Sequence, residues 1–215
     1  MKTAIEVNGH VEKTEKVHPW LSIWLKPRKT IRYVIDHKKF AWVFLLACLA
    51  GISNVLDGAS TSNIADKVST SVEGIVLFGL LLGPIFGLLI WAITSLLYWS
   101  IGKVFKGTGT LKEVMVASAW GFIPIIVSLL LWIPDLQILG IFNFSTLAPP
   151  MTAGESFIII ISALLEMVIS VWYVVVLIKA IAEAHRFSAL KGLGTVIIPG
   201  FVVFLFLLLL IFVSL

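Results

Sequence analysis

Residues 75–101 read IVLFGLLLGPIFGLLIWAITSLLYWSI, and none of these 27 residues carries a charge. About 20 apolar residues are enough for a helix to cross the ~30 Å hydrocarbon layer of a bilayer. Inside lipid every backbone N–H and C=O must find its partner within the segment, so the run is expected to be helical. The run exceeds the minimum length and can tilt, or bend at Pro84. We therefore interpret it as a membrane-spanning helix.

Four further apolar runs follow the same pattern, so the chain is predicted to be an all-α polytopic membrane protein. A polar N-terminal arm, residues 1–39, precedes a membrane domain, residues 40–215. The five predicted transmembrane helices lie at about 40–56, 75–101, 114–133, 157–178 and 196–214.

The composition of the 215 residues supports this class, since 59% are hydrophobic and 13% are charged. Soluble domains are about half apolar and about a quarter charged. Too few charged groups remain to cover a water-facing surface, which excludes an ordinary cytosolic enzyme, a disordered regulator and a nucleic-acid-binding protein. The single cysteine, Cys48, excludes an intramolecular disulfide.

The distribution of Lys and Arg predicts the orientation. The arm holds nine of the 16, and the loops 102–113 and 179–195 hold three each. The other two loops contain only Lys67. With five spans, a cytoplasmic N-terminus places 15 of the 16 basic residues inside. We expect a multi-pass protein of the plasma membrane with its C-terminus outside.

The end of the arm, residues 18–39, has an amphipathic pattern. Trp20, Ile23 and Trp24 recur at helical spacing among basic residues. This pattern predicts a segment lying in the headgroup layer, where its bases attract anionic lipid headgroups. The alternative is that the bases only set the topology. The six arm bases are Lys26, Arg28, Lys29, Arg32, Lys38 and Lys39.

Three glycines at four-residue spacing, Gly79, Gly83 and Gly87, fall on one face of the second predicted span, beside Pro84. Small residues in this pattern let another helix approach closely. We favour packing within the chain, because a five-span protein needs internal contacts first. The alternative is a groove for a partner protein or for a second copy of the chain.

Glu166 lies close to the centre of the fourth predicted span. A central acidic residue costs up to ~3 kcal/mol on insertion scales and usually faces the interior of a helical bundle. It then serves either as a neutral interhelical hydrogen-bonding group, which we favour, or as a proton or substrate site. Ser162 and Ser170 lie one turn either side of it, and Thr94, Ser95 and Ser128 on other spans are its candidate hydrogen-bond partners.

The segment Thr110-Leu111-Lys112-Glu113 fits the S/T-x-x-E capping box and predicts the start of the third span. Lysines and glycines nearby do not make a phosphate-binding loop, because the G-x-x-x-x-G-K-S/T order and a preceding strand are absent.

No predicted span contains histidine, so an intramembrane Ser-His dyad and an H-E-x-x-H zinc site are excluded. Glu183 and His185, on the last inner loop, are too sparse for a metal site. Asp57 and Asp135, at span ends, lack the flanking glycines of membrane aspartyl proteases. We predict a non-enzymatic protein without metal or cofactor.

Several segments, in their order and spacing, resemble the Yip family of five-span membrane proteins (Ypt-interacting proteins), and specifically its bacterial branch. The family's Y-G-P segment has Leu82 in place of Tyr, and the Asp expected three residues before the Gly is Leu80. These departures argue against a eukaryotic-type role with small GTPases. The resembling segments are WLKPRKT at 24–30, GP at 83–84, GTGTLKE at 107–113, AWGFIP at 119–124 and EAHRFS at 183–188.

The resemblance implies a non-enzymatic accessory or scaffold protein that associates with another membrane protein. Some bacterial relatives serve beside ABC exporters in envelope or antimicrobial-peptide defence, so ABC transporter subunits are the expected partners. A homo-oligomer remains open. The alternative function is a small transporter or channel working through Glu166.

Overall fold

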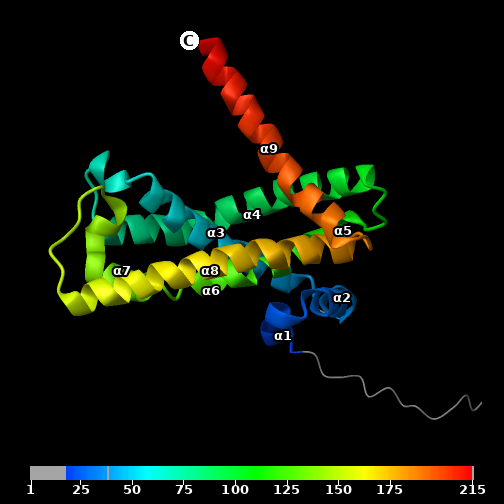
Figure 1. Cartoon of the computed structure of the whole chain (residues 1–215), viewed down its shortest axis with the longest axis horizontal. Helices are drawn as coiled ribbons and strands as arrows, with labels where there is room; N and C mark the ends of the chain where they lie inside the picture. The colour runs from blue at the N-terminus through cyan, green and yellow to red at the C-terminus, as the bar shows by residue number, and fades with distance from the viewer. Residues whose placement is uncertain (1–17, 38, 215) are drawn as a thin grey trace, which may run out of the picture.

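The computed structural model describes residues 18–37 and 39–214, and the regular secondary structure in them is helical (Figure 1). Four segments are long and apolar enough to cross a membrane, which confirms an all-helical, multi-pass protein. They are α3 (Ala41–Thr61), α4 (Val72–Val104), the segment Leu111–Phe144 and α8 (Ala153–Ala184). A further helix, α9 (Ala189–Ser214), covers the fifth predicted run, and its crossing of the membrane stays a prediction.

The third run is not the single helix predicted over 114–133. It is divided into α5 (Leu111–Gly121), α6 (Ile123–Ser128) and α7 (Trp132–Leu139), followed by a short 3-10 helix, η2 (Gly140–Phe144). Pro124 accounts for the first break, because proline is tolerated in the first turn of a helix but not in its interior. Figure 1 shows α7 running across the end of the bundle, where the sequence had predicted only a loop.

Local capping fixes where two of the long segments begin. The predicted box at α5 is confirmed: Thr110 Oγ1 accepts from the Glu113 N–H at 3.2 Å, and Glu113 Oε2 accepts from the Thr110 N–H at 2.7 Å. The same arrangement joins Thr152 and Glu155 at the start of α8. The second box has the same sequence pattern, T-x-x-E, but it had not been predicted.

The glycine face of α4 packs against α3. A Cβ atom at Gly83 would lie 2.7 Å from Ile52 Cα, and one at Gly87 would lie 2.7 Å from Gly51 Cα. At Gly79 a Cβ atom would instead meet the side chain of Leu56, with Cδ2 at 3.0 Å. The two backbones therefore touch, and α3 fills the groove in which a partner had been considered.

The predicted kink residue Pro84 lies inside α4, which continues through it as one helix. One backbone hydrogen bond is lost at a proline, but the long apolar segment on either side keeps the helix continuous.

The arm forms α1 (Pro19–Leu25) and α2 (Pro27–His37) at one end of the bundle. Figure 1 shows α2 nearly end-on, so it lies across the long helices, and its buried face contacts α5 and α8. We call this end, with the α4–α5 and α8–α9 connections, the arm end. The opposite end, with α7, is the pocket end. Residues 1–17 and the arm base Lys38 lie outside the described residues.

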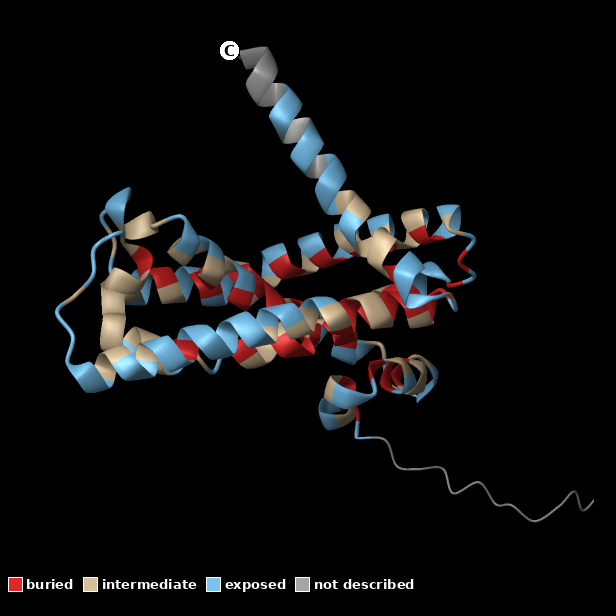
Figure 2. Cartoon of the chain, in the orientation of Figure 1, coloured by how far each residue is buried: buried red, intermediate tan, exposed pale blue. Residues whose placement is uncertain are grey.

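Burial is uneven along the bundle (Figure 2). Buried residues concentrate at the arm end, around the fully enclosed Ile31, Trp120 and Ile181. By contrast, most of α8 between Phe157 and Val171 is exposed. Figure 1 shows α9 diverging from the bundle, and its first turns contact α4 and α8.

Candidate functional site

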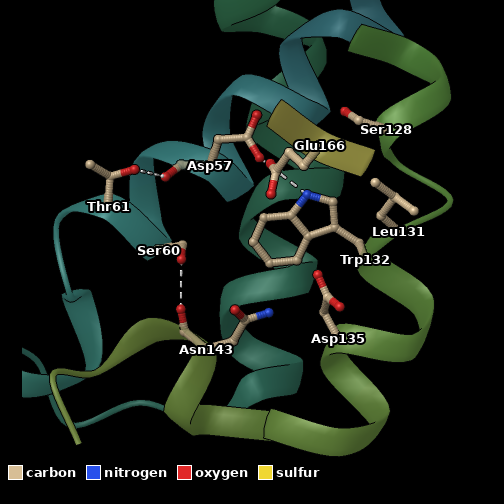
Figure 3. Close-up of a pocket in the computed structure, with 9 residues that line it drawn as sticks. All are labelled: Asp57, Ser60, Thr61, Ser128, Leu131, Trp132, Asp135, Asn143 and Glu166. Carbon is tan, nitrogen blue, oxygen red and sulfur yellow. Dashed lines mark hydrogen bonds between the residues drawn. The ribbon is translucent and has the colours of Figure 1, made fainter. Parts of the chain in front are cut away.

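Three carboxyl side chains from three different helices line one cavity of about 170 Å³ at the pocket end (Figure 3). Asp57 comes from α3, Asp135 from α7 and Glu166 from α8. We call this cavity the acidic pocket. Its other lining residues are Ser60, Thr61, Ser128, Leu131, Trp132 and Asn143.

Asp57 is the anchored member of the acidic pocket. Its Oδ1 accepts a hydrogen bond from Trp132 Nε1 at 3.2 Å, and its Oδ2 accepts one from Ser53 Oγ at 3.3 Å. The Trp132 ring stacks on Phe144 with centroids 5.6 Å apart. These contacts hold α7 and η2 against α3 and form one wall of the pocket.

A second set of contacts joins the loops at the pocket end. Ser60 Oγ donates to the Asn143 carbonyl at 2.7 Å. Asp66, in the α3–α4 connection, accepts from the backbone N–H and the hydroxyl of Thr146, each at 2.8 Å. Hydrogen bonds from Ser145 and Thr146 favour the charged carboxylate, so they lower the pKa of Asp66. These hydrogen bonds join the loops 57–74 and 134–156, which the sequence had predicted to lie on the same side of the membrane.

Glu166 and Asp135 are the unsatisfied members. The Glu166 carboxyl points into the pocket beside Asp57 and makes no hydrogen bond or ion pair with a described residue (Figure 3). Asp135 Oδ1 is buried and has no hydrogen-bond partner in the described part of the chain. The pocket lining contains no Lys or Arg. Such carboxyls can hold protons or attract a cation or a polar partner group.

Only part of this site could be predicted from the sequence. Glu166 was predicted to face the interior, and of its expected partners only Ser128 lines the same pocket. Thr94 instead donates to the Ile90 carbonyl, and Ser95 pairs with Ser118. Asp57 and Asp135 had been set aside together, because they lack the flanking glycines of membrane aspartyl proteases, and had not been linked to Glu166. Their place at span ends on the same side was the signal that could have joined them.

Within residues 18–37 and 39–214, no group of three His, Cys, Asp or Glu side chains could hold a metal ion. The three hydroxyls that line the pocket, those of Ser60, Thr61 and Ser128, donate to backbone carbonyls.

The arm end carries the opposite arrangement, in which charged groups are paired. Glu113 accepts from Arg186 at 2.5 Å and lies 3.6 Å from Arg32. Arg32 Nε also donates to Glu183 at 3.0 Å, and Arg28 donates to the Phe187 carbonyl at 2.9 Å. Arg28 and Arg32 were predicted to face lipid, but both instead form hydrogen bonds with other residues of the chain. Their long side chains reach the α8–α9 junction because α2 lies directly beside it.

His185 lies at the centre of the arm end. The sequence pattern did not predict that it packs inside the fold. Its side chain is buried, its Nε2 lies 3.2 Å from the Tyr98 carbonyl, and its ring stacks on Phe187. Burial lowers the pKa of His185 because it disfavours the charged ring. Gly102 and Gly107 leave space for the ring that any side chain would fill.

The comparison with protein families gives one match: the chain matches the Yip1 domain over residues 21–211. No curated protein and no solved structure matches the chain. The matched region takes in the arm helices, the four candidate spans and most of α9. Yip1-domain proteins are in general non-enzymatic membrane proteins. The chain therefore belongs to the Yip1 family.

Proposed function

We propose that this chain is a non-enzymatic membrane accessory protein that associates through its spans with another membrane protein. Subunits of an ABC exporter are the proposed partner, in envelope or antimicrobial-peptide defence. The exporter is chosen by analogy with bacterial relatives of the family, since a shared fold does not by itself fix function. The observation that supports association is the exposure of α8 around Glu166.

Glu166 lies near the middle of α8, and its side chain is exposed. Its carboxyl points into the acidic pocket, and an acidic residue within a span costs up to roughly 3 kcal/mol on insertion scales. Ala163 and Ser170, one turn before and one turn after it, are also exposed. A partner helix that covers this exposed face of α8 would close the pocket from outside and offer the carboxyl a hydrogen bond. The apolar residues around it would add van der Waals packing, which drives helix association in lipid.

Affinity capture tests this proposal. A tagged full-length chain is purified from its native membranes in mild detergent, and the co-purifying proteins are identified by mass spectrometry. We expect ABC exporter subunits, and we expect Ala163→Trp to lower their recovery at least about fivefold by overpacking the interface. Ala92→Trp, at an exposed position of α4, is the matched control and should retain them. Recovery of copies of this chain alone would instead favour a homo-oligomer and contradict the proposal.

The acidic pocket favours one alternative, a small transporter or channel that works through Glu166. Three carboxyls without a basic neighbour in the pocket lining would suit proton or cation binding. Glu166→Gln separates the two functions because it keeps the shape and removes the titrating group. An accessory protein should retain its partner and its function in cells. A well-folded Gln variant that retains its partner but has lost function would support the transporter.

We also propose a cytoplasmic arm end in the plasma membrane, on the basis of the Lys and Arg distribution. In a Cys48→Ser background, an impermeant thiol reagent applied to intact cells should label Val68→Cys at the pocket end. It should not label Val104→Cys at the arm end. Both positions are exposed, so the difference reports the side of the membrane. Labelling of Val104→Cys alone would reverse the orientation.

A further inference from the structure

Two cavities meet at Lys179, near the end of α8. One, of about 320 Å³, lies between the α1–α2 turn and α8 and is lined by four basic residues. We call it the basic pocket. Its lining residues are Leu25, Lys26, Pro27, Arg28, Lys29 and Lys179.

The second cavity, also of about 320 Å³, lies between α8 and α9 and is apolar apart from Lys179. We call it the apolar groove. Its lining residues are Val175, Ile178, Lys179, Ala189, Leu190 and Leu193. Lys179 lines both cavities, so the basic pocket and the apolar groove adjoin the same side chain.

The lining of the basic pocket contains bases but no carboxylate. No acidic residue lines either cavity, and Lys26, Arg28 and Lys179 have no carboxylate partner among the described residues. The two glutamates nearby in the fold, Glu113 and Glu183, are paired with Arg32 and Arg186. The pocket therefore presents a net positive charge to whatever enters it.

The arm helix α1 indicates that this pocket lies at the level of the lipid headgroups. Leu21 and Leu25 are 74% and 84% exposed, and Trp20 is also exposed. Apolar and Trp side chains of an amphipathic segment are stable in the interfacial layer. Leu25 also lines the basic pocket, so the exposed apolar face of α1 borders the basic site directly.

We propose that this junction binds one anionic phospholipid. Its phosphate would lie between Lys26, Arg28 and Lys179, and one acyl chain would lie along the apolar groove between α8 and α9. Basic pockets between spans bind phosphate headgroups by the same charge complementarity. Lys179 belongs to a span and not to the arm, so this is a discrete site, beyond a general attraction of the arm to a charged surface.

Lipid retention by the full-length protein tests the proposal. The purified protein is mixed with phosphatidylglycerol or phosphatidylcholine in detergent, and bound lipid is counted by native mass spectrometry. We expect one phosphatidylglycerol to be retained in preference to phosphatidylcholine. Lys179→Gln should weaken this binding about fivefold, the effect of one interfacial base. Lys179→Arg should restore it, which shows that the loss is not a folding defect.

The matched control is Lys191→Gln, a lysine in α9 that lines neither cavity and donates to the Phe105 carbonyl at 3.2 Å. It removes the same charge and should leave lipid retention unchanged. Ala189→Trp fills the apolar groove and should also lower retention. Inorganic phosphate at millimolar concentration should not displace the lipid, since it lacks the acyl chain. Equal retention by wild type and Lys179→Gln, equal binding of the two lipids, or displacement by phosphate would overturn the proposal.

Discussion

The two ends of the bundle differ in whether their charged side chains are paired. At the arm end, Arg32 and Arg186 are paired with Glu113 and Glu183, beside the buried cluster that contains Ile31, Trp120 and Ile181. At the pocket end, Glu166 shares a cavity with two aspartates and has no basic partner there. Paired charges stabilise a junction, whereas unpaired ones cost free energy within a membrane. The comparison indicates that the arm end maintains the fold and that the pocket end is available for function.

The sharpest way to break this comparison is to add one methyl group at each end. A Cβ atom at Gly109, at the arm end, would lie 2.5 Å from the Ala184 carbonyl oxygen. Gly109→Ala should therefore lower the free energy of unfolding by about 1–3 kcal/mol. At Gly58, near the pocket end of α3, a Cβ meets nothing within 4 Å. Gly58→Ala should leave the free energy of unfolding unchanged or raise it by up to about 1 kcal/mol, because alanine favours the helix and meets no neighbour.

Thermal unfolding in detergent measures both glycine variants. If Gly109→Ala were as stable as Gly58→Ala, that result would contradict the close packing around Gly109 and His185.

Removal of one carboxylate at each end is the second comparison. Glu113→Gln loses the ion pairs to Arg186 and Arg32 and weakens the capping box of α5. The expected loss is roughly 1–2 kcal/mol, because Arg186 is half exposed and its pair is partly screened. Glu166→Gln removes a charge that has no partner and should leave the unfolding temperature unchanged or higher. A larger loss for Glu166→Gln than for Glu113→Gln would reverse the roles of the two ends.

The buried His185 predicts a smaller, pH-dependent effect at the arm end. Its pKa is lowered by burial, so below the ordinary value of about 6.5 the unfolded chain binds more protons than the folded protein. The contribution of His185 to stability is therefore complete above pH 6.5 and is lost as the pH falls toward the lowered pKa. The unfolding temperature should be lower at pH 5.5 than at pH 7.5, and His185→Gln should reduce that difference. An unchanged difference in the variant would show that other groups cause it.

Local sequence patterns predicted the features that depend on neighbouring residues. The apolar runs became helices, and the Thr110–Glu113 capping box formed as its spacing required. The glycine face of α4 could also be predicted, because the spacing places all three glycines on one side of the helix. The helix that packs on this face could not be predicted, since Gly51 on α3 belongs to no periodic pattern.

The features that the sequence could not predict depend on how helices meet in space. Asp57, Asp135 and Glu166 are far apart in the chain, and α7 brings Asp135 to the other two only because the third run breaks after α6. His185 looked like an ordinary loop residue, because its burial depends on glycines in another connection. Arg28 and Arg32 looked like lipid-facing bases, because the position of α2 beside the α8–α9 junction is a tertiary feature.

Site-specific photo-crosslinking tests most directly whether the pocket-end part of α8 is the partner surface. A photoreactive amino acid is placed at Ala163 or Ser170, which flank Glu166, and at Ala92 on α4 as the control; all three positions are exposed. We expect a crosslink to one other membrane protein from Ala163 and Ser170 but not from Ala92. Lipid adducts alone at all three positions, or the same protein captured equally from Ala92, would contradict it.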